Sequence, residues 1–256
     1  MKEGQKLWSS EELILAMNLY CKLEFGKIHR NNPKVIDLAK LIGRTPNSVS
    51  FKLVNFASFD PSLKARGIKG ASNASKLDFE IWNEFYNNWD QLPFESEKLR
   101  AKYANTSVET LNEIDVKSLP KEGIERNRVV KVRVNQNFFR TMILATYNNE
   151  CCITGLSNKE LLVAGHIRPW GLDEKNRMNP QNGLALNALH DKAFENGLIT
   201  ILPNFKVRVS SILKKEKNDA VKDYFLKYDN QEIHLPSRFR PDKEFLEYHN
   251  DERFKK

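Results

Sequence analysis

Two histidines and one asparagine stand in an order that suits proton transfer or metal binding. His166 follows the apolar run LLVAG, Asn182 lies in the polar stretch after it, and His190 falls within the segment NALHDKAFENG. A neutral imidazole can take a proton from water near neutral pH, because its unperturbed pKa is close to that pH. Imidazole is also a common metal ligand. These three residues are therefore the first candidates for chemistry in the chain.

Hydrophobic period and turn residues predict the elements that position them. The expected order is a strand over 160–167, an irregular loop through Asn179 and Pro180, a strand over 183–186, a helix over 187–195 closed by Gly197, and a hairpin over 198–202 and 206–210. His166 then ends a strand, Asn182 lies in the returning loop, and His190 lies on the following helix. We expect an α+β architecture in this half of the chain.

This order and its local spelling resemble the HNH nucleases with a ββα-metal fold, in particular the HNH domains of bacterial predicted restriction endonucleases. The matching residues are Cys152, Thr154, Gly155, His166, Ile167, Pro169, Trp170, Arg177, Pro180, Asn182, Gly183, His190, Asp191, Phe194, Gly197 and Leu198. The resemblance covers about residues 127–210. The opening WSSEELILAMNLYCKLEFGKIHR is also similar to HNH proteins with a helical N-terminal half.

The resemblance implies a role for each member of the trio. His166 would be the general base, Asn182 would hold the loop through bonds to the backbone, and His190 would bind a divalent metal ion. The expected ion is Mg²⁺, with Mn²⁺ or another transition metal as the alternative. Hydrolysis of a phosphodiester needs an attacking hydroxide and stabilisation of the charge on the phosphate and leaving oxygen, which such an ion supplies.

One position departs from the family pattern. Gly165 stands where many HNH enzymes carry an Asp or His that binds the metal. The remaining ligand must come from elsewhere, with Asn182, Asp191 or Asp173 as candidates, or from water and phosphate oxygens, which Mg²⁺ tolerates. We take Asp191 as the metal-site candidate beside His190. Glu195 stands where relatives often have Asp.

Basic side chains flank this trio. Arg168, Arg177 and Lys192 could grip a phosphate, or each could be the partner of a surface carboxylate. Trp170, next to Pro169, is expected to pack and fix the loop. The C-terminal stretch beyond residue 210 is expected to pack on the nuclease core, and no chemistry is assigned to His234 or His249.

The N-terminal half is predicted to be helical. Ser9 and Glu12 spell a capping box before an apolar helix over 8–24. Further helices are expected over 35–42 and from Pro46 to about residue 56, with Thr45 as N-cap.

The spacing of these two helices fits a helix-turn-helix unit. Ala39, Gly43, Val49 and Leu53 occupy the small, turn and core positions. The outward side would present Arg44, Asn47, Ser48, Ser50 and Lys52 to bases or phosphates. A plain helical hairpin with a polar face is the alternative. The basic segment 57–75 is expected to be a loop, which could lie against phosphates or simply be a surface loop.

Composition sets the remaining limits. The 256 residues carry 41 Lys and Arg against 33 Asp and Glu, a net charge of +8, which suits a polyanionic partner without proving one. No apolar run is long enough for a membrane span, and no signal peptide is recognised. Cys21, Cys151 and Cys152 are too few for a disulfide framework or a four-cysteine zinc site. We expect a cytoplasmic protein.

The chain is expected to divide into a helical, DNA-binding domain over 1–104, a linker over 105–126, and an HNH endonuclease domain with a C-terminal extension over 127–256. The leading hypothesis is a metal-dependent endonuclease acting on double-stranded DNA, in restriction of foreign or modified DNA. Double-strand cleavage would need a homodimer, which we favour, or two sequential nicks. The alternatives are a DNA-binding regulator with a structural HNH-like module, and a nuclease whose first half binds proteins.

Overall fold

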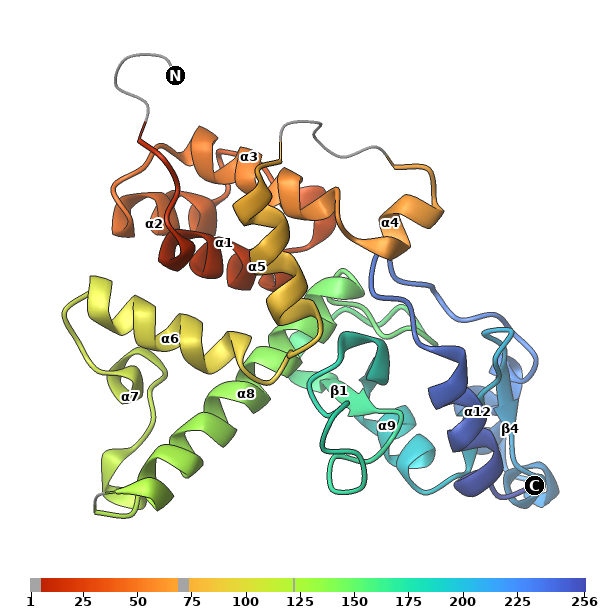
Figure 1. The fold of residues 1–256 in the computed structure, drawn as a ribbon. Helices are drawn as coiled ribbons and strands as arrows, with labels where there is room; N and C mark the ends of the chain where they lie inside the picture. The colour runs from red at the N-terminus through yellow and green to blue at the C-terminus, as the bar shows by residue number, and fades with distance from the viewer. Residues whose placement is uncertain (1–5, 69–73, 122) are drawn as a thin grey trace. The chain divides into compact units, whose positions relative to one another are not determined.

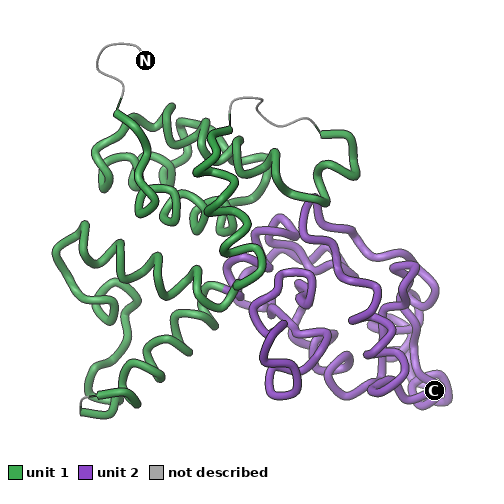
Figure 2. The backbone as a smooth tube through the Cα atoms, viewed as in Figure 1, with its two compact units in different colours: residues 1–138 green, residues 139–256 purple. Residues whose placement is uncertain are grey.

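The computed structural model of the protein describes residues 6–68, 74–121 and 123–256. The chain forms two compact units, residues 1–138 and 139–256 (Figure 2). The boundary falls inside the long helix α8 (Ile124–Thr146), which contributes residues to both units. Within the described ranges, no helix is long and apolar enough to cross a membrane.

Unit 1 is built of helices (Figure 1). In chain order they are α1 (Ser10–Lys22), the 3₁₀ turn η1 (Phe25–Lys27), α2 (Pro33–Leu41), α3 (Pro46–Ala57), α4 (Pro61–Ala65), α5 (Lys76–Tyr86), α6 (Leu92–Tyr103), α7 (Val108–Leu111), η2 (Val116–Ser118) and the first part of α8. The predicted capping box is confirmed, since Ser9 and Glu12 bond reciprocally at the start of α1. Tyr20 and Trp82 meet edge to face in the core, with ring centroids 5.9 Å apart.

Helices α2 and α3 pack on each other and are joined by a short turn. Gly43 takes a φ of 65° in that turn, a conformation that favours glycine. Ala39, Val49 and Leu53 are buried between the helices and their neighbours, as the spacing predicts. Thr45 caps α3 by accepting the backbone N–H of Ser48. The use of this helix pair for DNA binding stays a prediction.

Two of the side chains predicted to face outward do not. The Arg44 guanidinium bonds both carboxylate oxygens of Glu12, at 2.7 and 3.1 Å, and lies over the Trp8 ring. Lys52 Nζ lies 2.7 Å from Oδ1 of Asp78. The prediction was wrong for both residues because the two carboxylates are buried and need a cation.

The pKa of Glu12 reflects this pairing. Burial raises it, but hydrogen bonds from Arg44, Ser9 and Lys6 outweigh that effect and bring it to about 2. Asn47 is exposed and Ser48 is half-buried, so these two residues remain available on α3.

The segment expected to be a linker is folded into unit 1. Within 105–126, α7 and η2 form, and Ile114 and Leu119 pack against Val130 and Val134 of α8. Helix α8 also begins at Ile124, inside the segment expected to be a linker. The expected domain boundaries at 104 and 127 therefore differ from the observed division after residue 138. The basic loop expected over 57–75 contains α4, and its residues 69–73 lie outside the described ranges.

Unit 2 carries the strands. After the second part of α8 come η3 (Lys159–Leu161), β1 (Leu162–His166), η4 (Pro180–Asn182), β2 (Gly183–Asn187), α9 (Ala188–Glu195), β3 (Ile199–Ile201), β4 (Val207–Val209), α10 (Ser211–Lys215), α11 (Asp219–Tyr224), η5 (Leu226–Tyr228) and α12 (Lys243–Glu252). Strands β1 and β2 are antiparallel, with Leu162 opposite Asn187 and His166 opposite Gly183. Helix α9 packs on both strands. The predicted strand–loop–strand–helix order is confirmed.

Helix α8 fixes the end of β1 where His166 lies. A Cβ on Gly183, the partner of His166, would collide with the side chain of Ile143 and would come within 3.0 Å of the Phe139 ring. Glycine at this position therefore lets α8 approach the sheet closely. The approach places Phe139 beside His166, where it contributes to the site.

Candidate active site

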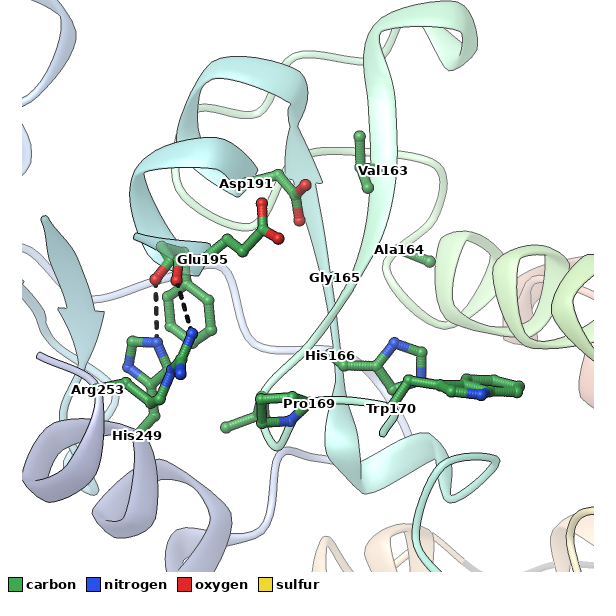
Figure 3. A pocket seen from close by; sticks show the side chains of 12 residues that line it. Val163, Ala164, Gly165, His166, Pro169, Trp170, Asp191, Glu195, His249 and Arg253 are labelled. Carbon is green, nitrogen blue, oxygen red and sulfur yellow. Dashed lines mark hydrogen bonds between the residues drawn. The ribbon is translucent and has the colours of Figure 1, made fainter. Parts of the chain in front are cut away.

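A cavity of about 320 Å³ in unit 2 gathers residues from β1, the loop after it, α9 and α12 (Figure 3). The lining residues with polar side chains are His166, Trp170, Asp191, Glu195, His249 and Arg253. The imidazole of His166 and the carboxylates of Asp191 and Glu195 line it from either side of the β1 backbone at Gly165 (Figure 3). Three stretches of the chain that are far apart in sequence thus converge on the end of one strand.

The His166 ring is held in one tautomer. Its Nε2 lies 2.8 Å from the backbone carbonyl oxygen of Arg177. A carbonyl oxygen only accepts hydrogen bonds, so Nε2 must carry the hydrogen and Nδ1 keeps its lone pair. Nδ1 has no hydrogen-bond partner among the residues that the structure describes. Burial lowers the pKa of His166 and outweighs the opposite effect of the Arg177 carbonyl, so the imidazole is neutral near neutral pH and can act as a base.

Two aromatic rings fix the orientation of this imidazole. Phe139 stacks on it with centroids 4.0 Å apart and an interplanar angle of 8°. Trp170 meets it edge-on at 5.4 Å. The Trp170 ring in turn lies under the Arg177 guanidinium at 5.1 Å. These contacts give Trp170 a packing role around the imidazole.

Asn182 ties together the loop that joins β1 to β2. Its buried side chain accepts the backbone N–H of Arg168 at 2.7 Å and donates to the carbonyl oxygens of Arg168 and Asn176, each at 3.1 Å. Its own carbonyl accepts the N–H of Ile167. Because the amide is fully used by the backbone, it positions the loop that carries Arg177, the acceptor of the His166 ring.

Asp191 fills the space that a side chain at position 165 would take. A Cβ on Gly165 would lie 2.5 Å from Oδ1 of Asp191. The missing ligand position on β1 is thus occupied by a carboxylate from α9. No hydrogen bond or ion pair of that carboxylate occurs within the described ranges, and burial together with the nearby Glu195 raises its pKa. Such a pair of carboxylates favours a cation between them.

His190 does not reach this cavity. Its Nε2 donates to the carbonyl oxygen of Tyr224 at 2.8 Å, and its Nδ1 lies 2.8 Å from Nδ2 of Asn187. Both ring nitrogens are therefore engaged, and the ring lines a different hollow beside Tyr228. His166, Asp191 and Glu195 line one cavity, with the imidazole and the two carboxylates on opposite sides of the β1 backbone (Figure 3), whereas His190 belongs to a separate hydrogen-bond network.

The three cations predicted to grip phosphate all have carboxylate partners. Arg168 Nη1 lies 3.0 Å from Oδ2 of Asp173. Asp173 does not line the cavity, so it is no longer a candidate metal ligand there. Arg177 pairs with Glu174, and the exposed Lys192 pairs with Glu195.

Sequence reasoning missed two residues of the cavity lining, His249 of α12 and Arg253, the C-cap residue of that helix. Arg253 lines the cavity and donates to the backbone oxygen of Glu195 at 3.3 Å, and over the described parts of the chain it has no carboxylate partner. His249 stacks on Phe194 of α9 at 3.6 Å and donates to its carbonyl oxygen. A histidine and an arginine four residues apart on one helix face were the available signal.

The comparison with protein families bears on this same segment. Residues 151–202 match the model of the HNH endonuclease family. These residues form an HNH domain. The match spans β1, the Asn182 loop, β2, α9 and β3, and therefore contains His166, Asp191 and Glu195. A comparison with curated proteins finds no match for the chain.

The HNH domain offers oxygen donors for a divalent ion. HNH nucleases generally use such ions, and Asp191 and Glu195, one helical turn apart on α9, face the cavity with oxygen atoms that suit Mg²⁺ or Mn²⁺. Within the described residues, no three His, Cys, Asp or Glu side chains are grouped closely enough to hold an ion. Two protein carboxylates with water completing the shell fit Mg²⁺, which keeps several waters.

Proposed function

We propose that the protein is a metal-dependent DNA endonuclease in which His166 is the general base. The observation that carries this proposal is the held imidazole of the cavity-lining His166: Nε2–H bonds the Arg177 carbonyl, and no described residue bonds Nδ1, which keeps its lone pair. The family match supports nuclease activity in general.

In this mechanism Nδ1 of His166 takes a proton from the water that attacks phosphorus. The positive charge that forms on the ring is stabilised by the Arg177 carbonyl, which accepts Nε2–H throughout. The stacked Phe139 ring prevents the imidazole from turning away. Asn182 acts through the loop backbone, so it is a positioning residue rather than a catalytic one.

Asp191 and Glu195 would hold the divalent ion. When bound, such an ion stabilises the charge on the phosphate and on the leaving 3′ oxygen. Arg253 is the guanidinium placed to bind a second phosphate oxygen, since Arg168 and Arg177 are neutralised by their own carboxylates. Its anchor is the backbone oxygen of Glu195, which ties it to the helix that supplies the carboxylates.

Unit 1 would supply binding to double-stranded DNA. Its α2–α3 pair leaves Asn47 exposed on α3, and the chain carries a net charge of +8. Restriction of foreign or modified DNA in the cytoplasm, with a homodimer for double-strand cleavage, is the setting we propose. The regulator hypothesis is less favoured. A site without catalytic activity has no physical need for an imidazole whose Nδ1 is free, as in His166, or for an unpaired half-buried carboxylate, as in Asp191.

The test is cleavage of supercoiled plasmid, unmodified and cytosine-modified, with Mg²⁺, Mn²⁺ or EDTA. We expect nicking or linearisation that requires the metal, disappears in Asp191→Asn, and persists in the matched surface variant Asp251→Asn. An RNA duplex of the same sequence run in parallel defines the substrate class. Retained DNA binding without cleavage of either plasmid under any metal condition would shift the account to the regulator.

A further inference from the structure

A second cavity, of about 410 Å³, lies within unit 1 among α1, α2 and α6. Its lining consists of two helical stripes and one arginine, namely Leu15, Asn18, Leu19 and Lys22 of α1, Lys34, Asp37, Leu38 and Leu41 of α2, and Arg100 of α6. Each stripe follows the i, i+3, i+4, i+7 spacing of a single helix face. The volume falls in the range of small-molecule pockets.

Positive charge is in excess at one end of this cavity. Glu97, which is buried, accepts from Lys22 Nζ at 3.1 Å and from the Arg100 guanidinium at 2.7 Å. It also accepts from Asn112, so one carboxylate serves three donors. Lys34 is exposed and has no ion pair within the described part of the chain.

The cations crowd Lys22 in particular. Burial lowers its pKa, and the charges of Arg100 and Lys34 lower it further, against the opposite effect of Glu97. The lining contains one carboxylate, Asp37, which is exposed. An anion in the cavity would therefore relieve repulsion among three cations.

Asn18 adds a hydrogen-bond donor without an acceptor. The residue is 3% exposed, and its amide nitrogen Nδ2 has no hydrogen-bond partner among the described residues. A buried donor that lacks a partner costs free energy, and each one in a native structure calls for an explanation. Asn18 and Lys22 lie one helical turn apart on α1, so both can reach a single anionic group.

The remaining lining is aliphatic. Leu15, Leu19 and Leu38 are nearly fully buried, and Leu41 is half-buried at the edge. Four leucines beside a cluster of donors match the usual composition of a ligand pocket, which is mostly apolar with a few convergent polar groups. They provide a surface for a hydrocarbon chain or a flat ring.

We propose that this cavity binds a small anion with an apolar body. A carboxylate or phosphate of the ligand accepts hydrogen bonds from Asn18 and Lys22, with Lys34 and Arg100 adding charge, and its apolar part covers the four leucines. The site gives unit 1 a ligand of its own, independent of nuclease chemistry.

The test is isothermal titration calorimetry of the full chain with three probes. Decanoate offers a carboxylate on an aliphatic chain, adenosine monophosphate a phosphate on a flat ring, and inorganic phosphate a head group alone. We expect decanoate or the nucleotide to bind at least about tenfold more tightly than inorganic phosphate, because burial of each methylene adds affinity. Binding of decanoate alone indicates a carboxylate ligand on an aliphatic chain, and binding of the nucleotide alone indicates a phosphate ligand on a flat ring.

Matched variants locate the binding. Lys34→Gln should weaken it about two- to fivefold, the usual effect of one exposed charge. Lys40→Gln, an exposed lysine on the same helix outside the cavity, should leave it unchanged. Asn18→Leu removes the donor and fills the cavity, and should abolish binding while circular dichroism remains that of the wild type.

Three results would overturn the proposal. These are no binding of decanoate or the nucleotide at millimolar concentration, equal affinity for inorganic phosphate, and equal weakening by Lys34→Gln and Lys40→Gln. Because Lys34 is exposed, its variant gives an answer even if Asn18→Leu fails to fold.

Discussion

Protonation of His249 should loosen the helix that carries the metal-site carboxylates. The imidazole is 2% exposed, stacks on Phe194 of α9, and bonds Thr200 Oγ1 at 2.8 Å through Nδ1. Burial is the main reason that its pKa falls from 6.5 to about 4, and the charge of Arg253 adds to the effect. The folded state therefore disfavours the charged ring, whereas the unfolded chain accepts the proton at its ordinary pKa.

The sign and size follow from linkage. Between the folded and unfolded pKa values the unfolded state binds more protons, so the contribution of His249 to stability is complete above the unfolded pKa and is lost as pH falls toward the folded one. A difference of about 2.5 pKa units corresponds to about 3 kcal/mol in full, of which about 2 kcal/mol is lost between about pH 7 and pH 5.

Hydrogen exchange of peptides from α9 and α12 measures the free energy of local opening. We compare this free energy between the wild type and His249→Gln at each pH. The difference between wild type and variant should shrink by about 2 kcal/mol over that range. His234→Gln, at an exposed position, should show no such pH-dependent difference. A wild-type-minus-His249→Gln difference that stays constant with pH would refute the reasoning.

Three further changes test other parts of the account. Gly165→Ala places a Cβ 2.5 Å from Asp191 Oδ1, so the carboxylate must move and Mn²⁺ affinity measured by calorimetry should fall about tenfold; unchanged affinity would remove Asp191 from the site. Asn182→Ala leaves three backbone groups without their partner and should lower the free energy of unfolding in urea by about 3 kcal/mol, with loss of cleavage; near-neutral stability would contradict its positioning role. Arg44→Met leaves the buried Glu12 with only Lys6 and the Ser9 N–H as partners and should cost about 2 kcal/mol in the same assay, whereas a loss of DNA affinity at full stability would restore Arg44 as a contact residue.

The β1–loop–β2–α9 order was predictable because its signals are local. Apolar runs, turn residues and the position of His166 at the end of a strand are all read from a few neighbouring residues, and the family spelling covers the same stretch. The helices of unit 1 were predictable for the same reason, from the Ser9–Glu12 capping box and from Thr45 and Pro46 at the start of α3.

The directions of individual side chains were less predictable, because distant partners decide them. Arg44 and Lys52 turn inward to carboxylates that lie 32 and 26 residues away in the chain. On α9, successive side chains diverge by about 100°, so His190 and Asp191 cannot face the same cavity. Which of the two faces it depends on how α9 sits on the strands, and that is a tertiary fact. Arg253 joins the site through α12, and its spacing of four residues from His249 was the only local signal for it.

The central claim, that His166 is the general base, is tested most directly by the nicking rate of His166→Ala with and without added imidazole. The account predicts a rate at least about 100-fold below that of wild type, with partial recovery when imidazole enters the space beside Phe139. His234→Ala should cut like the wild type and ignore imidazole. A His166→Ala variant that cuts within a few-fold of the wild-type rate would contradict the account.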